Sequence, residues 1–187
     1  MKVIETAIPG VLIIEPDLFG DARGFFMETY SERRYTQMGI PGRFVQDNMS
    51  SSTGNVLRGL HLQHPGDQAK LVSVISGSVF DVAVDVRVGS PSFGSFVAVE
   101  LTGENHRQFL LPEGFAHGFC VTSDHAVFAY KCTDYYSRPS EIGVRWNDPD
   151  IGIPWPVAAP SLSDKDLANP LLRDIPVDRL PVYRPEK

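Results

Sequence analysis

Two polar clusters in the sequence contain the residue types that acid–base chemistry needs, and each includes a histidine. The first cluster is Arg58-Gly59-Leu60-His61-Leu62-Gln63. In a regular strand Arg58 and His61 would face opposite sides, but a β-bulge at Gly59 would turn both toward one cavity. Such a pair could bind an anionic ligand and move a proton on it. The competing interpretation is a surface arginine next to a histidine that packs in the core.

The second cluster, residues 111–119, raises the question of a metal site. Its Pro-x-Gly-x-x-His spacing, which ends at His117, resembles part of the second cupin motif, in which the histidine binds a metal. The first cupin motif should then supply His-x-His and a nearby glutamate, but this chain has His61-x-x-His64 and no glutamate until Glu100. A metal site needs three or four ligands that converge on one point. We therefore expect no metal and no other cofactor.

Other polar residues could join these clusters if the fold brings them together. Tyr130 and Tyr136 share strand parity, so both could face one cavity, although core packing is the simpler interpretation. Lys70 stands just before an apolar run, where a strand should begin. The remaining candidates lie in two short polar segments, residues 21–28 and 46–48. Each of these features alone is more often a solvated edge than a site.

The strands that must position these side chains are visible as an alternation of apolar and polar residues. Over residues 79–87 the apolar side chains at even positions fall on one face, and Asp81, Asp85 and Arg87 fall on the other. This period of two predicts a strand with one core face and one polar face. Turns rich in glycine, serine and asparagine separate similar runs, which favours an all-β jelly roll. The other predicted strands are at residues 71–76, 96–101, 108–111, 119–122 and 127–132.

One helix is predicted in the first third of the chain. Ser31 can cap a helix over residues 32–38, and Gly39 can end it in a left-handed conformation. Pro41 then blocks its continuation. The few helices that we expect are short, and they lie mainly near the N-terminal third and the C-terminus.

The last forty residues differ from the strand-rich middle of the chain. Eight of the fifteen prolines lie from Pro149 onward, so residues 147–187 should form a loop-rich wrap with a short helix around 165–169. Apolar side chains in this stretch should pack it onto the strands. We therefore expect a single domain over residues 1–187, with a barrel core at about 45–135.

Composition argues against several classes of protein. The net charge of −6 and the pI of about 5.3 argue against nucleic acid as the main partner, because binding a phosphate backbone needs a basic face. No apolar run approaches the ~20 residues that cross a bilayer, and the first residues do not have the pattern of a signal peptide. Cys120 and Cys132 have no Cys-x-x-Cys spacing, so we expect buried free thiols and a cytoplasmic location.

Taken together, these segments resemble the dTDP-4-dehydrorhamnose 3,5-epimerase family along nearly the whole chain. The matching segments are residues 21–28, 46–48, 56–61, 70, 80–87, 90–94, 112–119, 130–133, 135–136, 146–149, 153–156 and 162–166. Each match is weak alone, but so many in order at family-like spacing indicate membership. The resemblance implies a metal-free, cupin-type jelly-roll β-barrel. It also implies a homodimer in which an N-terminal segment reaches into the partner's sheet or site.

The resemblance further implies a reaction and a role for each residue. The reaction is inversion of C3 and C5 of dTDP-4-dehydro-6-deoxy-D-glucose, which gives dTDP-4-dehydro-L-rhamnose. His61 is the implied base, Asp166 orients it, and Tyr130 is the acid on the opposite face of the sugar. Lys70 is the implied cation beside the charge that develops on O4. The implied substrate contacts are Arg23, Phe26, Glu28, Gln46, Asn48, Arg58, Lys70, His117, Tyr136 (stacked on the thymine), Glu141 and Lys165.

Two alternatives share much of this pattern. A single-centre epimerase or ketoisomerase acting on a dTDP-4-keto-6-deoxyhexose would need most of the same residues. A non-catalytic cupin that binds a nucleotide sugar would need only the binding residues. One departure from the family is Met49, which stands where many members have a polar residue and which bears on the polarity of the pocket near the sugar.

Overall fold

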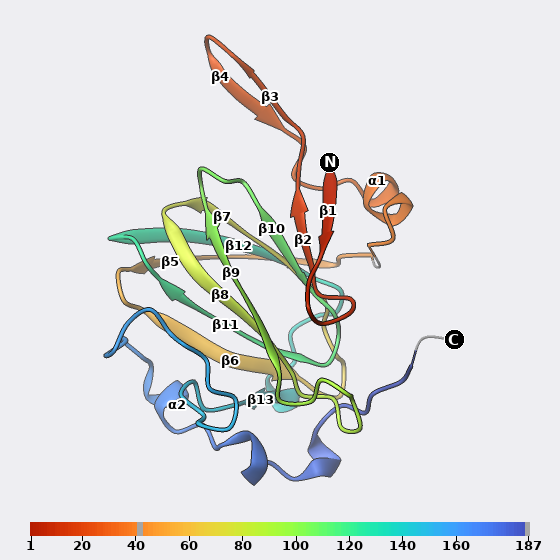
Figure 1. Ribbon diagram of the computed structural model, residues 1–187, viewed down its shortest axis with the longest axis vertical. Coiled ribbons are helices and arrows are strands. Elements are labelled where there is room, and N and C mark those ends of the chain that lie inside the picture. Colours follow the sequence, from red (N-terminus) through yellow and green to blue (C-terminus); the bar gives the residue numbers. More distant parts are fainter. Residues whose placement is uncertain (41–42, 186–187) are drawn as a thin grey trace.

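The computed structural model describes residues 1–40 and 43–185, and antiparallel strands dominate it (Figure 1). Within these residues the first sheet has the order β1-β2-β10-β7-β12-β5, with bounds β1 Lys2–Glu5, β2 Leu12–Glu15, β10 Gln108–Leu111, β7 Lys70–Ser76, β12 His125–Cys132 and β5 Gln46–Thr53. The second sheet has the order β13-β6-β11-β8-β9, with bounds β13 Glu141–Gly143, β6 Leu57–Gln63, β11 Phe115–Val121, β8 Ser78–Asp85 and β9 Phe96–Thr102. The all-β prediction is confirmed.

The remaining elements are short and lie outside the two sheets. A separate hairpin, β3 (Leu18–Asp21) and β4 (Gly24–Met27), projects away from the rest of the protein in Figure 1. The helical elements are α1 Glu32–Gln37, α2 Asp164–Leu167 and the 3₁₀ turns Arg138–Ser140, Leu172–Asp174 and Val177–Arg179. In the described ranges no helix has both the length and the apolar character needed to span a bilayer. The cytoplasmic location stays a prediction.

The two sheets enclose the main apolar core. Val72 and Phe128 from the first sheet pack in one buried cluster with Val79, Ala83 and Phe119 from the second. Burial of such side chains is the dominant favourable contribution to folding. The core therefore holds the two sheets face to face and fixes the spacing of the side chains between them.

A second apolar cluster forms on the outer face of the second sheet. Val82 and Val84 of β8 pack there with Ile151, Leu172 and Leu180 from the C-terminal part of the chain. Figure 1 shows this part, in blue, lying along the second sheet near β6 and β13. The proline-rich stretch is thus anchored to the strands by its apolar side chains.

The second face of β8 differs from the prediction. The alternating pattern predicted a polar face that carries Asp81 and Asp85, but both side chains have no exposed surface because that face turns into the sandwich. Each carboxylate has a basic partner, His117 for Asp81 and Arg87 for Asp85. A buried carboxyl group needs a hydrogen-bonding partner of this kind. The predicted polar face is therefore a second buried face.

Strand β6 carries the bulge predicted at Gly59. It pairs with β11 so that His61 lies opposite His117 and Arg58 lies opposite Phe119, which leaves one extra residue on β6. Gly59 has a φ of +123°, and a Cβ at this position would lie 2.6 Å from the backbone of β11. Only glycine fits there. The extra residue allows Arg58 and His61 to line the same cavity.

The first helix is one residue shorter than predicted. It ends at Gln37, and Gly39 has the predicted left-handed conformation, with a φ of +77°. Ser31 occupies the N-cap position, but its side chain makes no capping hydrogen bond, which corrects the prediction. Its carbonyl oxygen instead accepts a hydrogen bond from the backbone N–H of Tyr35. Pro41 lies outside the described residues.

Two further boundaries were predicted too late in the chain. Strand β11 begins at Phe115 rather than at residue 119, because the whole run from Phe115 pairs with β8 directly after the turn at Gly114. His117 and Gly118 interrupt the apolar residues in the first half of β11, so an apolar pattern does not reveal it. Helix α2 begins before residue 165, because the Ser163 hydroxyl accepts a hydrogen bond from the backbone N–H of Asp166 and caps the helix.

Candidate active site

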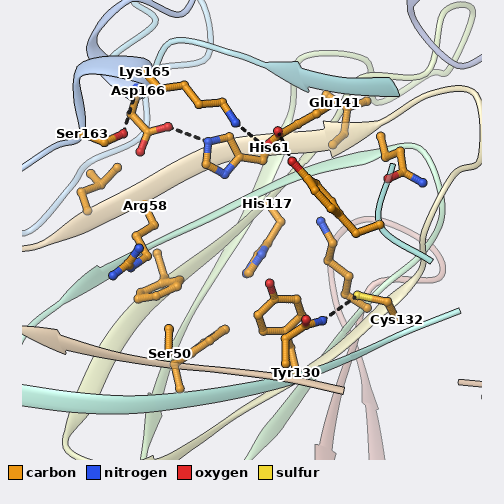
Figure 2. Close-up of a pocket in the computed structure, with 18 of the residues that line it drawn as sticks. Ser50, Arg58, His61, His117, Tyr130, Cys132, Glu141, Ser163, Lys165 and Asp166 are labelled. Atoms are coloured by element: carbon orange, nitrogen blue, oxygen red, sulfur yellow. Dashed lines mark hydrogen bonds and ion pairs between the residues drawn. The ribbon is translucent and has the colours of Figure 1, made fainter. Parts of the chain in front are cut away.

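A cavity of about 660 Å³ lies between the two sheets (Figure 2). Strands β5, β7 and β12 of the first sheet line one side, and β6 and β11 of the second sheet line the other, together with α2. All but three of the site residues predicted from the sequence line this cavity. They are His61, Lys70, Tyr130, Asp166, Gln46, Asn48, Arg58, His117, Tyr136, Glu141 and Lys165.

His61 and Asp166 form a hydrogen-bonded pair at the wall formed by β6. His61 Nε2 lies 2.5 Å from Asp166 Oδ1, and Asp166 is almost fully buried. Burial by itself would raise the pKa of Asp166, but hydrogen bonds with His61 and Ser163 outweigh it and hold that pKa below its usual value. The carboxylate is therefore charged at neutral pH and fixes the imidazole. Figure 2 shows the other ring nitrogen of His61 turned toward the cavity.

Tyr130 stands on the opposite wall. It belongs to β12 of the first sheet, whereas His61 belongs to β6 of the second. Figure 2 shows its ring rising from β12 with the hydroxyl directed into the space below His61. Burial raises the pKa of Tyr130, and the nearby Cys132 adds to this effect. The phenol therefore keeps its proton at neutral pH and can donate it.

Lys70 places an amino group deep in the cavity. It is the first residue of β7 and lies beside Cys132 of β12. Burial lowers the pKa of Lys70, while Cys132, Glu141 and Asp81 oppose the shift. Asp81 lies behind the cavity wall, where its Oδ1 is 3.0 Å from His117 Nε2. A buried ammonium group in such a cavity is suited to stabilise negative charge that develops on a bound ligand.

Arg58 and the polar side chains of β5 line a second part of the cavity. The Arg58 Nε donates a hydrogen bond to Ser52 Oγ over 3.1 Å. Gln46 Nε2 donates to Asn48 Oδ1 over 3.0 Å, and Asn48 Nδ2 lies 3.7 Å from Cys132 Sγ. The guanidinium fork of arginine matches phosphate oxygens, so this region is suited to an anionic group.

Tyr136, Glu141 and Lys165 form a hydrogen-bonded and ion-paired group at the rim of the cavity. The Tyr136 hydroxyl donates to Glu141 Oε2 over 2.8 Å, and Lys165 Nζ lies 2.5 Å from Glu141 Oε1. Burial alone would raise the pKa of Glu141, but Lys165 and Tyr136 hold it below its usual value. The Tyr136 ring is 55% exposed, which leaves it open to stack on a planar ligand.

Three predicted contacts lie outside this cavity. Arg23, Phe26 and Glu28 belong to or directly follow the projecting β3–β4 hairpin. Arg23 pairs only with its neighbour Asp21 among the described residues, Phe26 is 69% exposed, and Glu28 pairs with Arg34. Within one chain the structure does not bring these residues to the cavity that holds His61.

Sequence reasoning missed several lining residues and misjudged one. Ser50 and Ser163 both line the cavity; the parity of Ser50 with Asn48 could have revealed the first, and the cap before α2 the second. Cys132 lines it as well. Met49, in contrast, is 74% exposed and alternates away from Asn48 and Ser50. It therefore does not set the polarity of the cavity.

The described residues contain no group of three or more histidine, cysteine, aspartate or glutamate side chains that could hold a metal ion. Three carboxylate–histidine pairs occur among the described residues, and two of them include a histidine that lines the cavity: His61 with Asp166 and His117 with Asp81. A carboxylate that orients an imidazole is the usual arrangement for proton transfer. The cavity thus combines two histidine pairs, a phenol and an ammonium group.

Comparisons with known proteins identify this combination. A protein-family model described as dTDP-4-dehydrorhamnose 3,5-epimerase matches residues 5–174. The dTDP-4-dehydrorhamnose 3,5-epimerase of Shigella flexneri is 56% identical over 169 residues, which cover 89% of this chain and 93% of that protein. The enzyme of the same name from Salmonella typhimurium is 55% identical over 175 residues, which cover 92% and 96%.

A solved structure agrees with these matches. The crystal structure of a dTDP-6-deoxy-D-glucose-3,5-epimerase from Legionella pneumophila, in complex with dTDP-4-keto-L-rhamnose, superposes with a TM-score of 0.96 at 53% identity. The match covers 98% of this chain and 99% of that one, and it confirms the predicted cupin-type jelly roll. With the family model and the two relatives, it shows that this chain belongs to the dTDP-4-dehydrorhamnose 3,5-epimerase family.

Proposed function

We propose that the epimerase activity of this chain, inversion of C3 and C5 of dTDP-4-dehydro-6-deoxy-D-glucose to give dTDP-4-dehydro-L-rhamnose, uses His61 as base and Tyr130 as acid. One observation carries this assignment: the imidazole and the phenol come from different sheets and enter one cavity from opposite sides. Inversion at carbon requires a proton to leave one face and another to arrive at the opposite face. A site with one base and one acid on facing walls meets that requirement.

The C4 ketone makes both protons removable. C3 and C5 each flank C4, so loss of either proton leaves an electron pair that forms a C=C bond and places the negative charge on O4. The free ring nitrogen of His61 accepts the proton, and Asp166 stabilises the imidazolium that results. Tyr130 then protonates the same carbon from the other side, which restores the ketone. Exchange with solvent returns both side chains to their starting states before the second centre reacts.

Lys70 is the group assigned to the enolate oxygen. A single well-placed donor to a developing oxyanion contributes about 3–4 kcal/mol. Lys70 lines the same cavity as His61 and Tyr130, and Cys132, Glu141 and Asp81 oppose the lowering of its pKa by burial. We assign its ammonium group to O4 of a sugar ring held between His61 and Tyr130. The lysine thus lowers the barrier to proton loss at both carbons.

The other residues of the cavity are assigned to the nucleotide part of the ligand. The Legionella relative binds dTDP-4-keto-L-rhamnose, which supports a dTDP-sugar as the ligand of this chain. Arg58 is assigned to the diphosphate because a guanidinium matches phosphate oxygens. Tyr136 is assigned to the thymine, on which its exposed ring can stack. Glu141 and Lys165 hold Tyr136 in place.

Turnover in D2O tests this function. A double epimerase leaves product with deuterium at both C3 and C5, because the donated proton comes from a group in exchange with solvent. Mass spectrometry and proton NMR of the product measure both positions. Deuterium at C3 alone or at C5 alone would show that the chain is a single-centre epimerase and that double inversion is wrong. A non-catalytic binding protein would leave the sugar without deuterium.

The hairpin completes the site in a homodimer, in which β3–β4 of one chain enters the cavity of its partner. An isolated two-stranded hairpin is marginally stable in water, yet this one exposes Leu18, Phe19, Phe25 and Phe26. Exposed apolar surface of this kind marks an interface. A partner chain would bury these side chains and bring Arg23, exposed near the hairpin turn, to the ligand of the other subunit.

Mixing two inactive variants tests this exchange. Arg23→Ala damages only the hairpin, and His61→Ala damages only the cavity. If the hairpin of one chain contacts the ligand in the partner's cavity, each mixed dimer in a 1:1 mixture has one site with both an intact hairpin and an intact cavity. Random subunit exchange makes about half of the dimers mixed, so the mixture should reach about a quarter of the wild-type activity. Light scattering checks that a dimer is present. If the mixture stays as inactive as its components, or if the protein is a monomer, the exchange does not occur.

A further inference from the structure

Strand β5 presents a row of polar side chains on the face that meets the cavity. Gln46, Asn48, Ser50 and Ser52 alternate along it, two residues apart. Three of them have partners: Gln46 binds Asn48, Asn48 also contacts Cys132, and Ser52 accepts from Arg58. Ser50 differs, because its Oγ is buried and has no hydrogen-bond partner in residues 1–40 and 43–185. It nevertheless lines the cavity.

An unpaired buried hydroxyl needs an explanation, since leaving such a group without a partner costs free energy. The adjacent Ser51 shows that serines of this strand can be satisfied. Ser51 points to the opposite face, where its Oγ lies 2.7 Å from His125 Nε2. Ser52, on the same side as Ser50, has a partner as well, so the missing partner is specific to Ser50.

The position of Ser50 narrows the choice of ligand group. Its neighbours two residues away are Asn48, which lies opposite Tyr130 on β12, and Ser52, which binds Arg58. Residues two apart in a strand are separated by about 7 Å. Ser50 thus lies between the phenol assigned to the sugar ring and the guanidinium assigned to the diphosphate. In a dTDP-sugar, the group between the ring and the rest of the diphosphate is the phosphate attached to C1.

We propose that the Ser50 hydroxyl donates a hydrogen bond to the sugar-linked phosphate of the bound nucleotide. Phosphate oxygens only accept hydrogen bonds, which matches a hydroxyl whose proton has no acceptor in the protein. The bond fixes the C1 end of the sugar, while Arg58 holds the diphosphate. Ser50 is in this sense a positioning residue, and its assignment rests on the proposed function because it presupposes a dTDP-sugar in this cavity.

Calorimetric titration of dTDP and dTMP tests the assignment, because only dTDP carries the second phosphate. Four proteins are compared: wild type, Ser50→Ala, Ser50→Thr and the matched control Ser51→Ala. Loss of a hydrogen bond to a charged group should raise the Kd of Ser50→Ala for dTDP about tenfold or more. Its Kd for dTMP should stay at the wild-type value. Ser50→Thr keeps the hydroxyl and should bind dTDP within about threefold of wild type.

The thermal unfolding of the same proteins gives a second readout. Without ligand, Ser50→Ala should melt no lower than wild type, because it removes an unsatisfied hydroxyl. Its stabilisation by dTDP should be smaller, since tighter binding to the native state raises the melting temperature further. If Ser50→Ala binds dTDP like Ser51→Ala, or weakens for dTMP and dTDP equally, the assignment is wrong.

Failure of this inference can be told apart from failure of the proposed function. Arg58→Ala is expected to weaken dTDP binding whatever Ser50 does. If wild type binds dTDP and Arg58→Ala binds it poorly, but Ser50→Ala is unaffected, only the role of Ser50 is overturned. If wild type does not bind dTDP at all, the proposed function and the role of Ser50 both fail.

Discussion

His61→Ala is expected to abolish inversion and solvent exchange together, with kcat lowered by roughly 10²–10⁴-fold. The variant removes the only proposed proton acceptor on its wall of the cavity, so neither C3 nor C5 can lose a proton. Incubation of substrate in D2O, followed by NMR of the sugar protons, measures exchange separately from inversion. Binding of dTDP should stay near the wild-type value, because His61 is assigned to the sugar and Arg58 to the diphosphate.

Two companion variants make this result specific. His125→Ala removes an exposed histidine whose Nε2 bonds to Ser51 outside the cavity, and it should keep full activity. Asp166→Asn keeps a hydrogen-bonding group beside His61 but loses the charge, so its activity should fall between wild type and His61→Ala. If His61→Ala still exchanges C3 or C5 protons at the wild-type rate, another group is the base and the assignment is wrong.

The two-sheet architecture is what allows one site to serve two carbons. His61 is carried by a strand of one sheet and Tyr130 by a strand of the other, and the shared apolar core keeps the two sheets at a fixed separation. The acid and the base cannot move to the same side of the sugar without separation of that core. In the proposed mechanism the two-sheet sandwich thus sets the stereochemistry, and Lys70 is the group assigned to the charge that develops on O4.

The sequence predicted the strands well where one face is apolar and failed where burial depends on distant partners. Asp81 has the pattern of a solvent-facing residue, yet it is buried because His117, 36 residues away in the sequence, pairs with it. No local pattern contains that information. Likewise the small and polar residues Ala116, His117 and Gly118 follow Phe115 in β11, and their burial comes from pairing with β8 and β6, so the apolar signal revealed only the second half of the strand.

The site residues were predicted better than their arrangement. The resemblance to the family indicated eleven of the side chains that line the cavity, because the motifs that carry it recur in order along the chain. It could not show that Arg23 and Phe26 lie on a hairpin away from this chain's own cavity, since their place depends on a second subunit in the proposed dimer. Ser50 was missed for another reason. It lies in a run of three serines with no motif of its own, and the predicted strands did not include residues 46–53, so its parity with Asn48 was not used.

Tyr130→Phe should separate two events that His61→Ala removes together. The variant keeps the base, so C3 and C5 protons are still removed and deuterium from D2O still enters. It lacks the proton donor on the opposite wall, so inversion should fall by roughly 10²–10⁴-fold. The matched control is Tyr135→Phe, which changes an exposed tyrosine outside the cavity and should leave inversion intact.

The configuration of the deuterated sugar decides between the possible outcomes. With Tyr130→Phe, His61 both removes the proton and returns a deuteron to the same face, so recovered substrate should carry deuterium with its original configuration. If exchange falls by the same factor as inversion, Tyr130 is needed for proton removal and is not simply the acid. If inversion continues unchanged, the donor is another group. Exchange with retention is the result expected when the base acts on one face and no acid is present on the other. A base that works alone returns the proton to the face from which it came, so the configuration at that carbon does not change.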